Sequence, residues 1–309
     1  YYVYFAYNMR NELERFYNYI SSVERYSQNT RQSYQNDIDG FASFILVTYQ
    51  ISQLTEATHF HIRSWIVTLM EINSSSHTIH RKISALSTFY KYLRRFEGLG
   101  IDPMAKVIRP KANKRLPVTV PKDELRYDQI LGTAEPDGYS NAMARLMILF
   151  LYTTGIRRSE LININEADID FSRMILKVTG KGKKERFVPI SNDLVIETEK
   201  FKLLKKSSLP MGEENLLFLT LHGKPVYPKL VYNVVNSFLK TIPNLERKSP
   251  HILRHSFATH LSDAGADINA IKMLLGHSSL ASTQVYMHNA PQRLKSIYSK
   301  AHPRAEKEL

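Results

Sequence analysis

A cluster of prolines about one third of the way along the chain divides the sequence into two parts. Four prolines fall between residues 103 and 121, and basic side chains stand among them: Pro103, Lys106, Arg109, Pro110, Lys111, Lys114, Arg115, Pro117 and Pro121. Proline lacks a backbone donor and clashes with the preceding helical turn, so this density favours an extended connector. We therefore predict a domain at 1–108, a basic linker at 109–120 and a second domain at 121–309.

The first domain carries apolar side chains at helical spacing. Thr30 is expected to cap a helix that runs to Ile45, and Thr58 to cap another that runs to Leu69. After a break at residues 74–76, apolar residues recur at steps of 4, 3, 4 and 3: Ile79, Ile83, Leu86, Tyr90 and Leu93. These steps are typical of an amphipathic helix. Residues 1–10 begin without Met and are interpreted as an upstream extension or an expression remnant, with Met9 a candidate start.

The second domain is predicted to mix helices with a small sheet. Residues 140–153 have the pattern of a buried helix, and the chain becomes helical again from Leu230. Between them, strands are expected at 169–178 and 186–190, on either side of a tight turn at 180–183. The fold class is therefore mainly α with a small β-sheet.

The composition favours a polyanionic partner outside the secretory route. The net charge is +13 and the pI is about 9.6, which indicates nucleic acid or an anionic membrane surface. The longest apolar run, at 146–152, is too short to span a bilayer, and the chain opens without a secretory signal pattern. The lack of cysteine excludes disulfides, thiolate metal sites and a cysteine nucleophile. We expect a soluble, cytoplasmic protein.

The helix predicted at 79–93 also has a basic face. Five cations lie away from its apolar stripe: Arg81, Lys82, Lys91, Arg94 and Arg95. Such charges usually form a solvated surface, and the alternative is a helix that lies against DNA phosphates.

Two segments of the second domain hold cations suited to a phosphodiester. In TGIRRSEL (154–161), Gly155 permits a helix break, Ser159 or Thr154 is expected to cap the next helix, and an adjacent arginine could bind phosphate. The alternative is a surface arginine paired with Glu160. In VTGKGKKER (178–186), the spacing of a nucleotide-binding loop is absent, but a lysine at a hairpin tip can give its proton to a leaving oxygen. The alternative is an ordinary charged hairpin.

Two further segments add histidines, an arginine and a tyrosine. In HILRHSFATH (251–260), His251 and Arg254 share one helix face, whereas His255 lies roughly 100° around it. This segment does not match a zinc site, because it lacks the HExxH glutamate and a third ligand at a suitable spacing. We therefore expect His255 and His260 to pack in the core or to support the site residues. LLGHSS (274–279) is followed by TQVYMH (283–288), whose Tyr286 is one of 18 tyrosines.

The order and spacing R-x23-K-x69-H-x2-R-x22-H-x8-Y resemble the tyrosine recombinase family. The local strings are most similar to its Xer-type bacterial members: TGIRRSEL, VTGKGKKERFVPI, HILRHSFATHL, LLGHSSLASTQVYMH and the terminal HPRA. The likeness covers nearly the whole chain. It implies a helical SAM-like core-DNA-binding domain, a catalytic domain with a C-terminal oligomerisation tail, and DNA cutting and rejoining through a 3′-phosphotyrosyl bond without metal, ATP or another cofactor.

The resemblance also implies a role for each site residue. Arg157 and Arg254 would clamp the scissile phosphate, and His277 would bind a nonbridging oxygen. Lys181 would act as general acid, with proton transfer assisted by His251, and Tyr286 would be the nucleophile. Glu160 matches the supporting acid of the family, and DNA contacts are expected from Arg81, Lys82, Lys91, Arg94 and Lys183. Arg158 departs from the family, whose Xer-type members more often have an apolar residue there, but the Gly-x-Arg-x-Ser-Glu-Leu frame selects Arg157.

The implied partners are double-stranded DNA and further recombinase subunits. A homotetramer, or a heterotetramer with a related recombinase, would act on two DNA sites, with a DNA translocase as an additional partner in some Xer systems. Chromosome-dimer resolution is our first interpretation, and integration or excision of a mobile element is the alternative. A type IB topoisomerase and a non-enzymatic architectural DNA-binding protein are weaker alternatives. The tail at 290–309 is expected to dock on a neighbouring subunit through Leu294, Ile297 and Tyr298.

Overall fold

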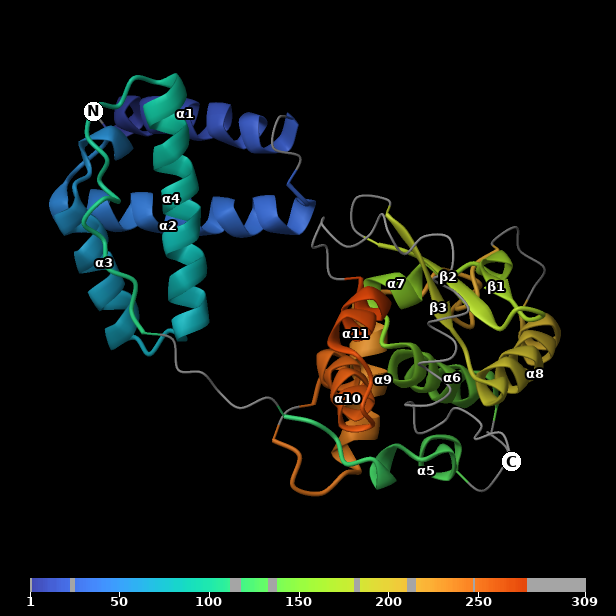
Figure 1. Cartoon of the computed structure of the whole chain (residues 1–309). Helices are drawn as coiled ribbons and strands as arrows, with labels where there is room; N and C mark the ends of the chain where they lie inside the picture. Colours follow the sequence, from blue (N-terminus) through green and yellow to red (C-terminus); the bar gives the residue numbers. More distant parts are fainter. Residues whose placement is uncertain are drawn as a thin grey trace. The chain divides into compact units, whose positions relative to one another are not determined.

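The chain folds as two compact units, Tyr1–Arg115 and Leu116–Leu309 (Figure 1). The computed structural model describes residues 2–22, 26–111, 118–132, 138–180, 184–209, 215–246 and 248–276, without the side chains of 2–11, 127 and 131. The predicted linker at 109–120 includes residues 112–117, which lie outside the described part, so its bounds stay a prediction.

Within its described residues, the first unit contains helices and connecting loops and no strand. Its elements are α1 (Tyr2–Ser22), α2 (Gln28–Tyr49), a 3-10 turn (Leu54–Glu56), α3 (His59–Glu71) and α4 (Ser76–Phe96). Helix α2 packs against α1, α3 and α4. Aromatic rings fill the core, where Phe16 meets Phe89 edge to face at 5.2 Å and Phe41 lies 5.2 Å from Trp65.

Local hydrogen bonding sets where these helices begin. Thr58 is the N-cap of α3, as predicted, and its backbone N–H donates to the ring of His61 at 3.0 Å. The prediction for α2 is wrong, because the cap is Ser27, three residues before Thr30. The Ser27 hydroxyl accepts from the Thr30 backbone N–H at 3.3 Å, so Thr30 already belongs to the first turn.

The second unit combines helices with a three-stranded sheet. Its helices are α5 (Tyr127–Leu131), α6 (Gly138–Thr154), α7 (Arg158–Ile162), α8 (Asn192–Ser208), α9 (Pro228–Lys240), α10 (Pro250–Asp263) and α11 (Ile268–Leu275), with 3-10 turns at Asp123–Leu125 and Glu166–Asp168. The strands are β1 (Ile169–Asp170), β2 (Ile175–Thr179) and β3 (Glu185–Pro189), which form an antiparallel sheet in that order.

The sheet corrects the prediction of one strand over 169–178. A turn at residues 171–174 divides that segment into β1 and β2. Asp170 holds the turn, because its carboxylate accepts from the Arg173 backbone N–H at 2.9 Å and from Ser172 at 2.7 Å. Met174 then takes a left-handed conformation, with φ of 53°. Strand β3 pairs with β2 so that Arg186 faces Val178.

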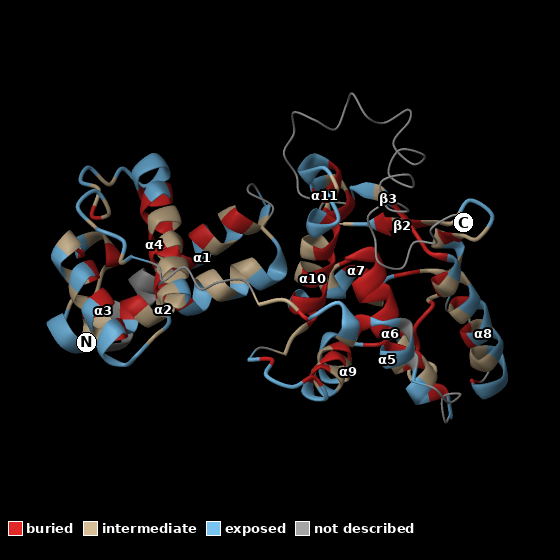
Figure 2. Ribbon diagram, turned by 60° about the horizontal axis from the view of Figure 1, so that its bottom comes forward, coloured by how far each residue is buried: buried red, intermediate tan, exposed pale blue. Residues whose placement is uncertain are grey.

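Helix α6 is the centre of the second core. It is buried continuously from Leu146 to Thr154, and α5, α7, α8, α9 and α10 pack around it (Figure 2). An apolar helix covered on all sides needs no polar face, which explains why the sequence shows no clear amphipathic stripe here. The predicted fold class, mainly α with a small sheet, is confirmed. Within the described part of the chain, no helix has both the length and the apolar character needed to cross a membrane.

Candidate active site

The chain reverses sharply at the end of α6, within the string TGIRRSEL. Gly155 has φ of +62°, and a Cβ there would lie 2.3 Å from Cδ1 of the buried Phe257 ring. The position therefore requires glycine for both conformation and space. The reversal brings Arg157 to the start of α7.

Helix α7 begins with a cap that the sequence did not predict. Neither Ser159 nor Thr154 caps it: the N-cap is Arg157, and the Glu160 carboxylate accepts from the Arg157 backbone N–H at 2.7 Å. The other Glu160 oxygen accepts from Arg157 Nη1 at 2.8 Å. A carboxylate is favourable at this end of a helix because the free N–H groups carry partial positive charge. The predicted Arg157–Glu160 pairing is present, and Arg158 points to a different place, near the Pro228 carbonyl at 3.4 Å.

Arg186 of β3 joins this pair, although no sequence pattern singled it out. Its Nη1 and Nη2 each donate to a different oxygen of Glu160 at 2.9 Å. The pairing is bidentate, the geometry in which a guanidinium fixes a carboxylate most firmly. Only 13% of the Arg186 side chain and 3% of the Glu160 side chain are exposed, so both charges are withdrawn from solvent.

Helix α10 supplies the next cation. Arg254 donates from Nη1 to the Gly155 carbonyl at 2.6 Å, which ties α10 to the reversal after α6. His251 lies one turn earlier on α10 and is exposed. The structure therefore places His251 and Arg254 on neighbouring turns, as the spacing predicted.

Three arginines converge on the last turn of α11. Each donates to one of three successive backbone carbonyls: Arg186 to Leu274 at 2.8 Å, Arg254 to Leu275 at 2.5 Å and Arg157 to Gly276 at 3.3 Å. Carbonyls at a helix C-terminus lack helical partners and carry partial negative charge, so guanidinium groups are favourable there. Gly276 ends the helix with φ of +64°.

We call Arg157, Arg186, Arg254 and Glu160 the arginine cluster. It contains three guanidinium groups and one carboxylate, which gives a surplus of two positive charges. Burial and then the charges of Arg157 and Arg186 lower the pKa of Arg254 to about 10. Burial raises the pKa of Glu160, but hydrogen bonds and charge from Arg186 and Arg157 outweigh it, so that pKa lies below 4.5. Arg254 and Glu160 are therefore charged at neutral pH, and the surplus of positive charge in the cluster suits an anion.

The remaining predicted catalytic residues lie outside the described residues. They are Lys181, His277 and Tyr286, together with the DNA-contact candidate Lys183. The described chain stops at Gly276, directly before His277, and at Gly180, directly before Lys181.

The other histidines of α10 face different surroundings. His260 is buried and its Nδ1 lies 3.0 Å from the hydroxyl of Tyr152, a packing role like the one predicted. His255 has its Nε2 buried without a hydrogen-bond partner in the described part of the chain. Among those same residues, no three His, Asp or Glu side chains gather as metal ligands would.

The basic face of α4 is partly engaged within the first unit. Arg81 and Lys82 both pair with Asp37, which is 1% exposed, and the Lys82–Asp37 distance is 3.1 Å. Lys82 also lies 5.0 Å from the ring centre of Trp65. A buried carboxylate needs such partners, so these two cations have a structural task that the helical pattern could not reveal.

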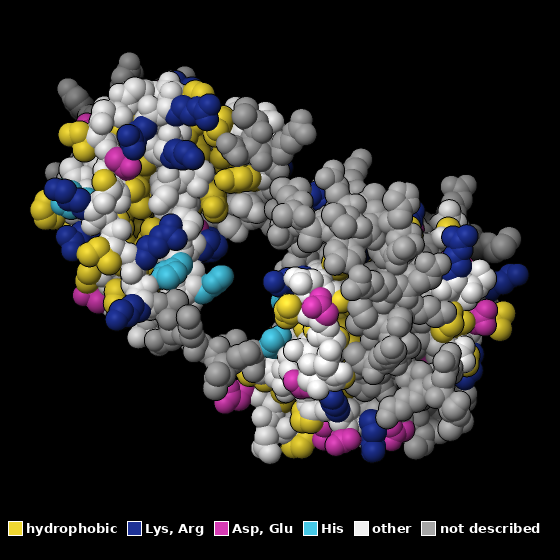
Figure 3. Space-filling view, in the orientation of Figure 1, with side chains coloured by type: hydrophobic (Ala, Val, Ile, Leu, Met, Phe, Trp, Pro, Cys, Tyr) yellow, Lys and Arg dark blue, Asp and Glu magenta, His cyan; other side chains and the backbone are white. Residues whose placement is uncertain are grey.

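Cations nearer the end of α4 remain more accessible. Arg94 pairs with Asp102 at 3.0 Å and half of its side chain is exposed. Lys91 is exposed, and it has no ion pair with any described carboxylate. Lysine and arginine side chains are spread over the face of this unit that Figure 3 shows.

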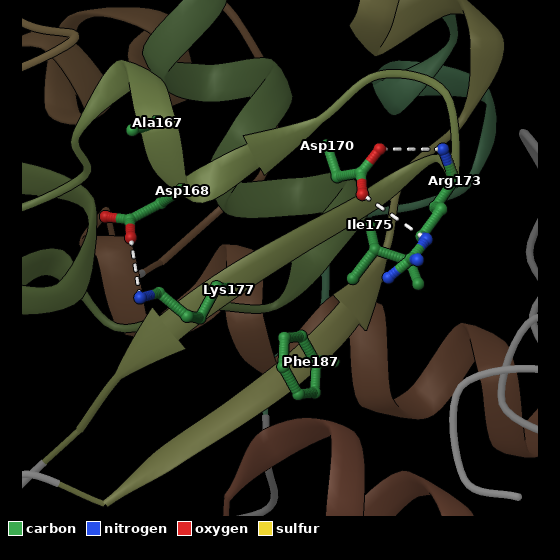
Figure 4. A pocket seen from close by; sticks show the side chains of 7 residues that line it. All are labelled: Ala167, Asp168, Asp170, Arg173, Ile175, Lys177 and Phe187. Carbon is green, nitrogen blue, oxygen red and sulfur yellow. Dashed lines mark hydrogen bonds and ion pairs between the residues drawn. The ribbon is translucent and has the colours of Figure 1, made fainter.

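Residues of β1, β2 and β3 and of the adjoining turns line a hollow on the sheet (Figure 4). Side chains alternate between the two faces of a strand, and the hollow uses Lys177 and Phe187, whereas Arg186 lies on the opposite face. Its charges are matched internally, since Asp168 lies 3.5 Å from Lys177 Nζ and Asp170 lies 3.7 Å from Arg173 Nε. We therefore do not assign it to the candidate active site.

Two protein-family models match the chain, one in each unit. The family described as "Phage integrase family" matches residues 122–293, and "Phage integrase, N-terminal SAM-like domain" matches residues 13–97. A protein named Tyrosine recombinase XerC from Staphylococcus aureus is 34% identical over 304 residues, 97% of this chain and 99% of its own. The protein of the same name from Chlorobaculum parvum is 32% identical and covers 95% of this chain and 94% of its own.

Solved structures share the fold. The XerH site-specific recombinase bound to a palindromic difH substrate has a TM-score of 0.67 at 19% identity, covering 93% of this chain and 94% of its own. The Tn1549 transposon integrase in complex with circular intermediate DNA has a TM-score of 0.68 at 19% identity, covering 87% and 92%. The class is thus that of DNA strand-exchange enzymes: the chain belongs to the phage integrase family of tyrosine recombinases. Within that family it is an Xer-like site-specific recombinase, which confirms the resemblance stated from the sequence.

Proposed function

We propose that the chain binds double-stranded DNA and cuts it by attack of the Tyr286 hydroxyl on a phosphodiester. The phosphorus–oxygen bond to the 5′-oxygen breaks, a 3′-phosphotyrosyl bond forms, and the phenol proton leaves as a proton is given to the 5′-oxygen. Rejoining is the reverse reaction with a new 5′-hydroxyl. Because the phosphotyrosyl ester retains the energy of the broken bond, each cycle needs no ATP.

The surplus of positive charge in the arginine cluster is the observation that carries this proposal. A phosphodiester has one negative charge, and a second develops as the nucleophile adds to phosphorus. Arg157 and Arg254 are proposed to bind the nonbridging oxygens, where one well-aimed donor is typically worth about 10² to 10³ in rate. His277 would provide another donor to the same oxygens.

Proton transfer is assigned to the remaining residues. A free phenol has a pKa of about 10, so a positive field is needed to favour its anion near neutral pH. Lys181 is proposed to protonate the 5′-oxygen, and His251 to assist proton transfer. Glu160 supports the site by holding Arg157.

DNA binding beyond the cleavage point is assigned to α4 and the hairpin. Lys91, Arg94 and Lys183 are proposed to contact phosphates. For Arg81 and Lys82, the same proposal must compete with their pairing to Asp37, so we expect smaller contributions from them.

The biological role that we propose is chromosome-dimer resolution in the cytoplasm. The relatives named XerC align with the chain almost from end to end, which favours this role over integration or excision of a mobile element. Four subunits, of one kind or of two related kinds, would act on two DNA sites, with the tail at 290–309 docking between neighbours. A DNA translocase is a further proposed partner.

Trapping the covalent intermediate tests the proposal. A library of nicked duplexes from the source chromosome is incubated with the protein, so that the broken strand diffuses away and the protein–DNA bond persists. We expect an adduct that disappears in Tyr286→Phe while DNA binding remains. Tyr227→Phe, at a tyrosine 51% exposed, is the matched control and should form the adduct.

Sequencing the attached DNA then identifies the DNA target site and distinguishes between the two biological roles. Enrichment of one chromosomal site would support dimer resolution, and enrichment of element ends would favour the mobile-element alternative. If the wild-type protein forms no adduct with any duplex, or if Tyr286→Phe still forms it, the proposed chemistry is wrong.

A further inference from the structure

Arg186 occupies a special place in the arginine cluster, because it links three of the elements that form the cluster: β3, α7 and α11. It is located on β3, its Nη1 and Nη2 hold Glu160 of α7, and its Nε holds the Leu274 carbonyl of α11 at 2.8 Å. All three nitrogens of the guanidinium are thus engaged with the protein. A group bound in this way is suited to hold other residues in place.

The position of Arg157 depends on Glu160, and that of Glu160 on Arg186. Glu160 accepts from both the backbone N–H and Nη1 of Arg157, at 2.7 and 2.8 Å. The same two oxygens accept from Nη1 and Nη2 of Arg186, which form the planar fork of its guanidinium. Without the fork, a nearly buried carboxylate would have to rotate or shift to recover its lost hydrogen bonds, and Arg157 would move with it.

Close packing makes this support stiff. A Cβ at Gly276 would lie 3.2 Å from Cδ and Nη1 of Arg186, and one at Gly180 would lie 3.4 Å from Glu160 Oε1. The glycine backbones of two separate segments therefore pack close to the Arg186–Glu160 pair, which limits the other geometries it can adopt.

We propose that Arg186 is a positioning residue for strand cleavage: through Glu160 it fixes the Arg157 guanidinium in the orientation that binds the scissile phosphate. This inference rests on the proposed function of Arg157 as a phosphate ligand. Arg186 itself does not touch the substrate. Its effect is transmitted by hydrogen-bond geometry, so a lysine, which keeps the charge but lacks the fork, cannot replace it.

The test compares two suicide substrates that carry the site recovered from trapped Tyr286. One has a normal scissile phosphodiester, and the other has a methylphosphonate at that position, whose nonbridging charge is absent. Removing an arginine that neutralises this charge should therefore slow adduct formation less on the methylphosphonate. The same holds for removing a residue that positions such an arginine. Rates of adduct formation are measured at saturating DNA, beside the Kd for DNA.

We expect Arg186→Gln to slow adduct formation on the phosphodiester by about 10²-fold, the loss typical of a reacting group displaced by about 1 Å. Arg186→Lys should lose nearly as much, and Kd should change little in both. On the methylphosphonate the gap to wild type should shrink at least about tenfold, and Arg157→Gln should show the same pattern. The matched control Arg173→Gln removes an exposed arginine from the turn between β1 and β2 and should leave both rates unchanged.

Glu160 supplies a second, independent check. If Arg186 acts through Glu160, Glu160→Gln with Arg186→Gln should lose no more than the larger single loss, because the two residues form one unit. The double variant removes the buried carboxylate of Glu160 together with its partner Arg186. It therefore remains informative if Arg186→Gln alone fails to fold.

Three outcomes would overturn the inference: a wild-type rate in Arg186→Gln, an equal loss on both substrates, or additive losses with Glu160→Gln. A wild-type protein that forms no adduct would instead contradict the proposed function. The two failures are therefore distinguishable.

Discussion

Replacing Gly155 by alanine would test the link between the reversal after α6 and the arginine cluster. The added methyl group would meet Phe257 at 2.3 Å from Cδ1 and 2.7 Å from Cε1, and the ring is fully buried. The backbone at Gly155 also has φ of +62°, in the left-handed region that a Cβ disfavours. We expect Gly155→Ala to destabilise the second unit.

The expected magnitude has two parts. The left-handed conformation costs roughly 1–2 kcal/mol, and overpacking a filled core typically costs about 1–3 kcal/mol, so the total is about 2–5 kcal/mol. Gly265 gives a matched control, because its φ is +84° and a Cβ added there would meet no atom within 4 Å. Gly265→Ala therefore carries the conformational cost without the clash.

Urea unfolding of the full chain can assign the effect to one unit. Trp65, the single tryptophan, is buried in the first unit, so its fluorescence follows that unit, whereas far-UV circular dichroism follows the helices of both. Gly155→Ala should lower the midpoint of the dichroism transition of the second unit and leave the Trp65 transition in place. Adduct formation should fall as well, because the Gly155 carbonyl holds Arg254 Nη1 at 2.6 Å.

The difference in free energy of unfolding between Gly155→Ala and Gly265→Ala tests the steric argument. Both gain a similar term from the reduced entropy of the unfolded chain, so their difference isolates the clash with Phe257. A free energy of unfolding for Gly155→Ala within about 0.5 kcal/mol of that for Gly265→Ala would refute the steric argument. Partial recovery in Gly155→Ala with Phe257→Leu would support it.

Two further predictions concern titration and salt. Burial, and then the charge of Lys122, lower the pKa of His260 below its usual 6.5. As pH falls through 6.5, the unfolded chain binds a proton before the folded one does, so the second unit should lose stability, and His260→Gln should flatten that part of its stability–pH curve. An unchanged curve in the variant would contradict the assignment. Lys91→Gln should reduce the slope of log Kd for DNA against log salt by about 1, because one phosphate contact is lost, whereas Lys240→Gln, at the end of α9, should not change it. Equal slopes for Lys91→Gln and wild type would remove Lys91 from the DNA interface.

Local sequence patterns predicted the elements well where one cause dominates. The 4, 3, 4, 3 spacing that ends at Leu93 marks α4, and Thr58 caps α3, because both signals act within a few residues. Where several local signals compete, the prediction was wrong. Ser27 rather than Thr30 caps α2, and a turn held by Asp170 interrupts the long predicted strand.

The candidate site was predictable only in part. The string around Gly155 identified Arg157 and Glu160, three residues apart, whose pairing needs only one helical turn. Arg186 was not singled out, because a lone arginine in a basic hairpin resembles any other surface charge. Its partners are 26 and 88 positions away, at Glu160 and Leu274, and only the packing of β3 against α7 and α11 reveals them.

The sequence by itself determined the family, the fold class and the approximate positions of the helices, because ordered motifs and helical periodicity are properties of the linear chain. The tertiary structure decided which charges act together. It assigned Arg81 and Lys82 to the buried Asp37. It also brought three arginines to successive carbonyls at the C-terminal end of α11, and two of them to Glu160. The physical reason is that a buried charge takes its partners from whichever elements pack beside it, and that packing joins residues as far apart as Arg157 and Gly276, 119 positions along the chain.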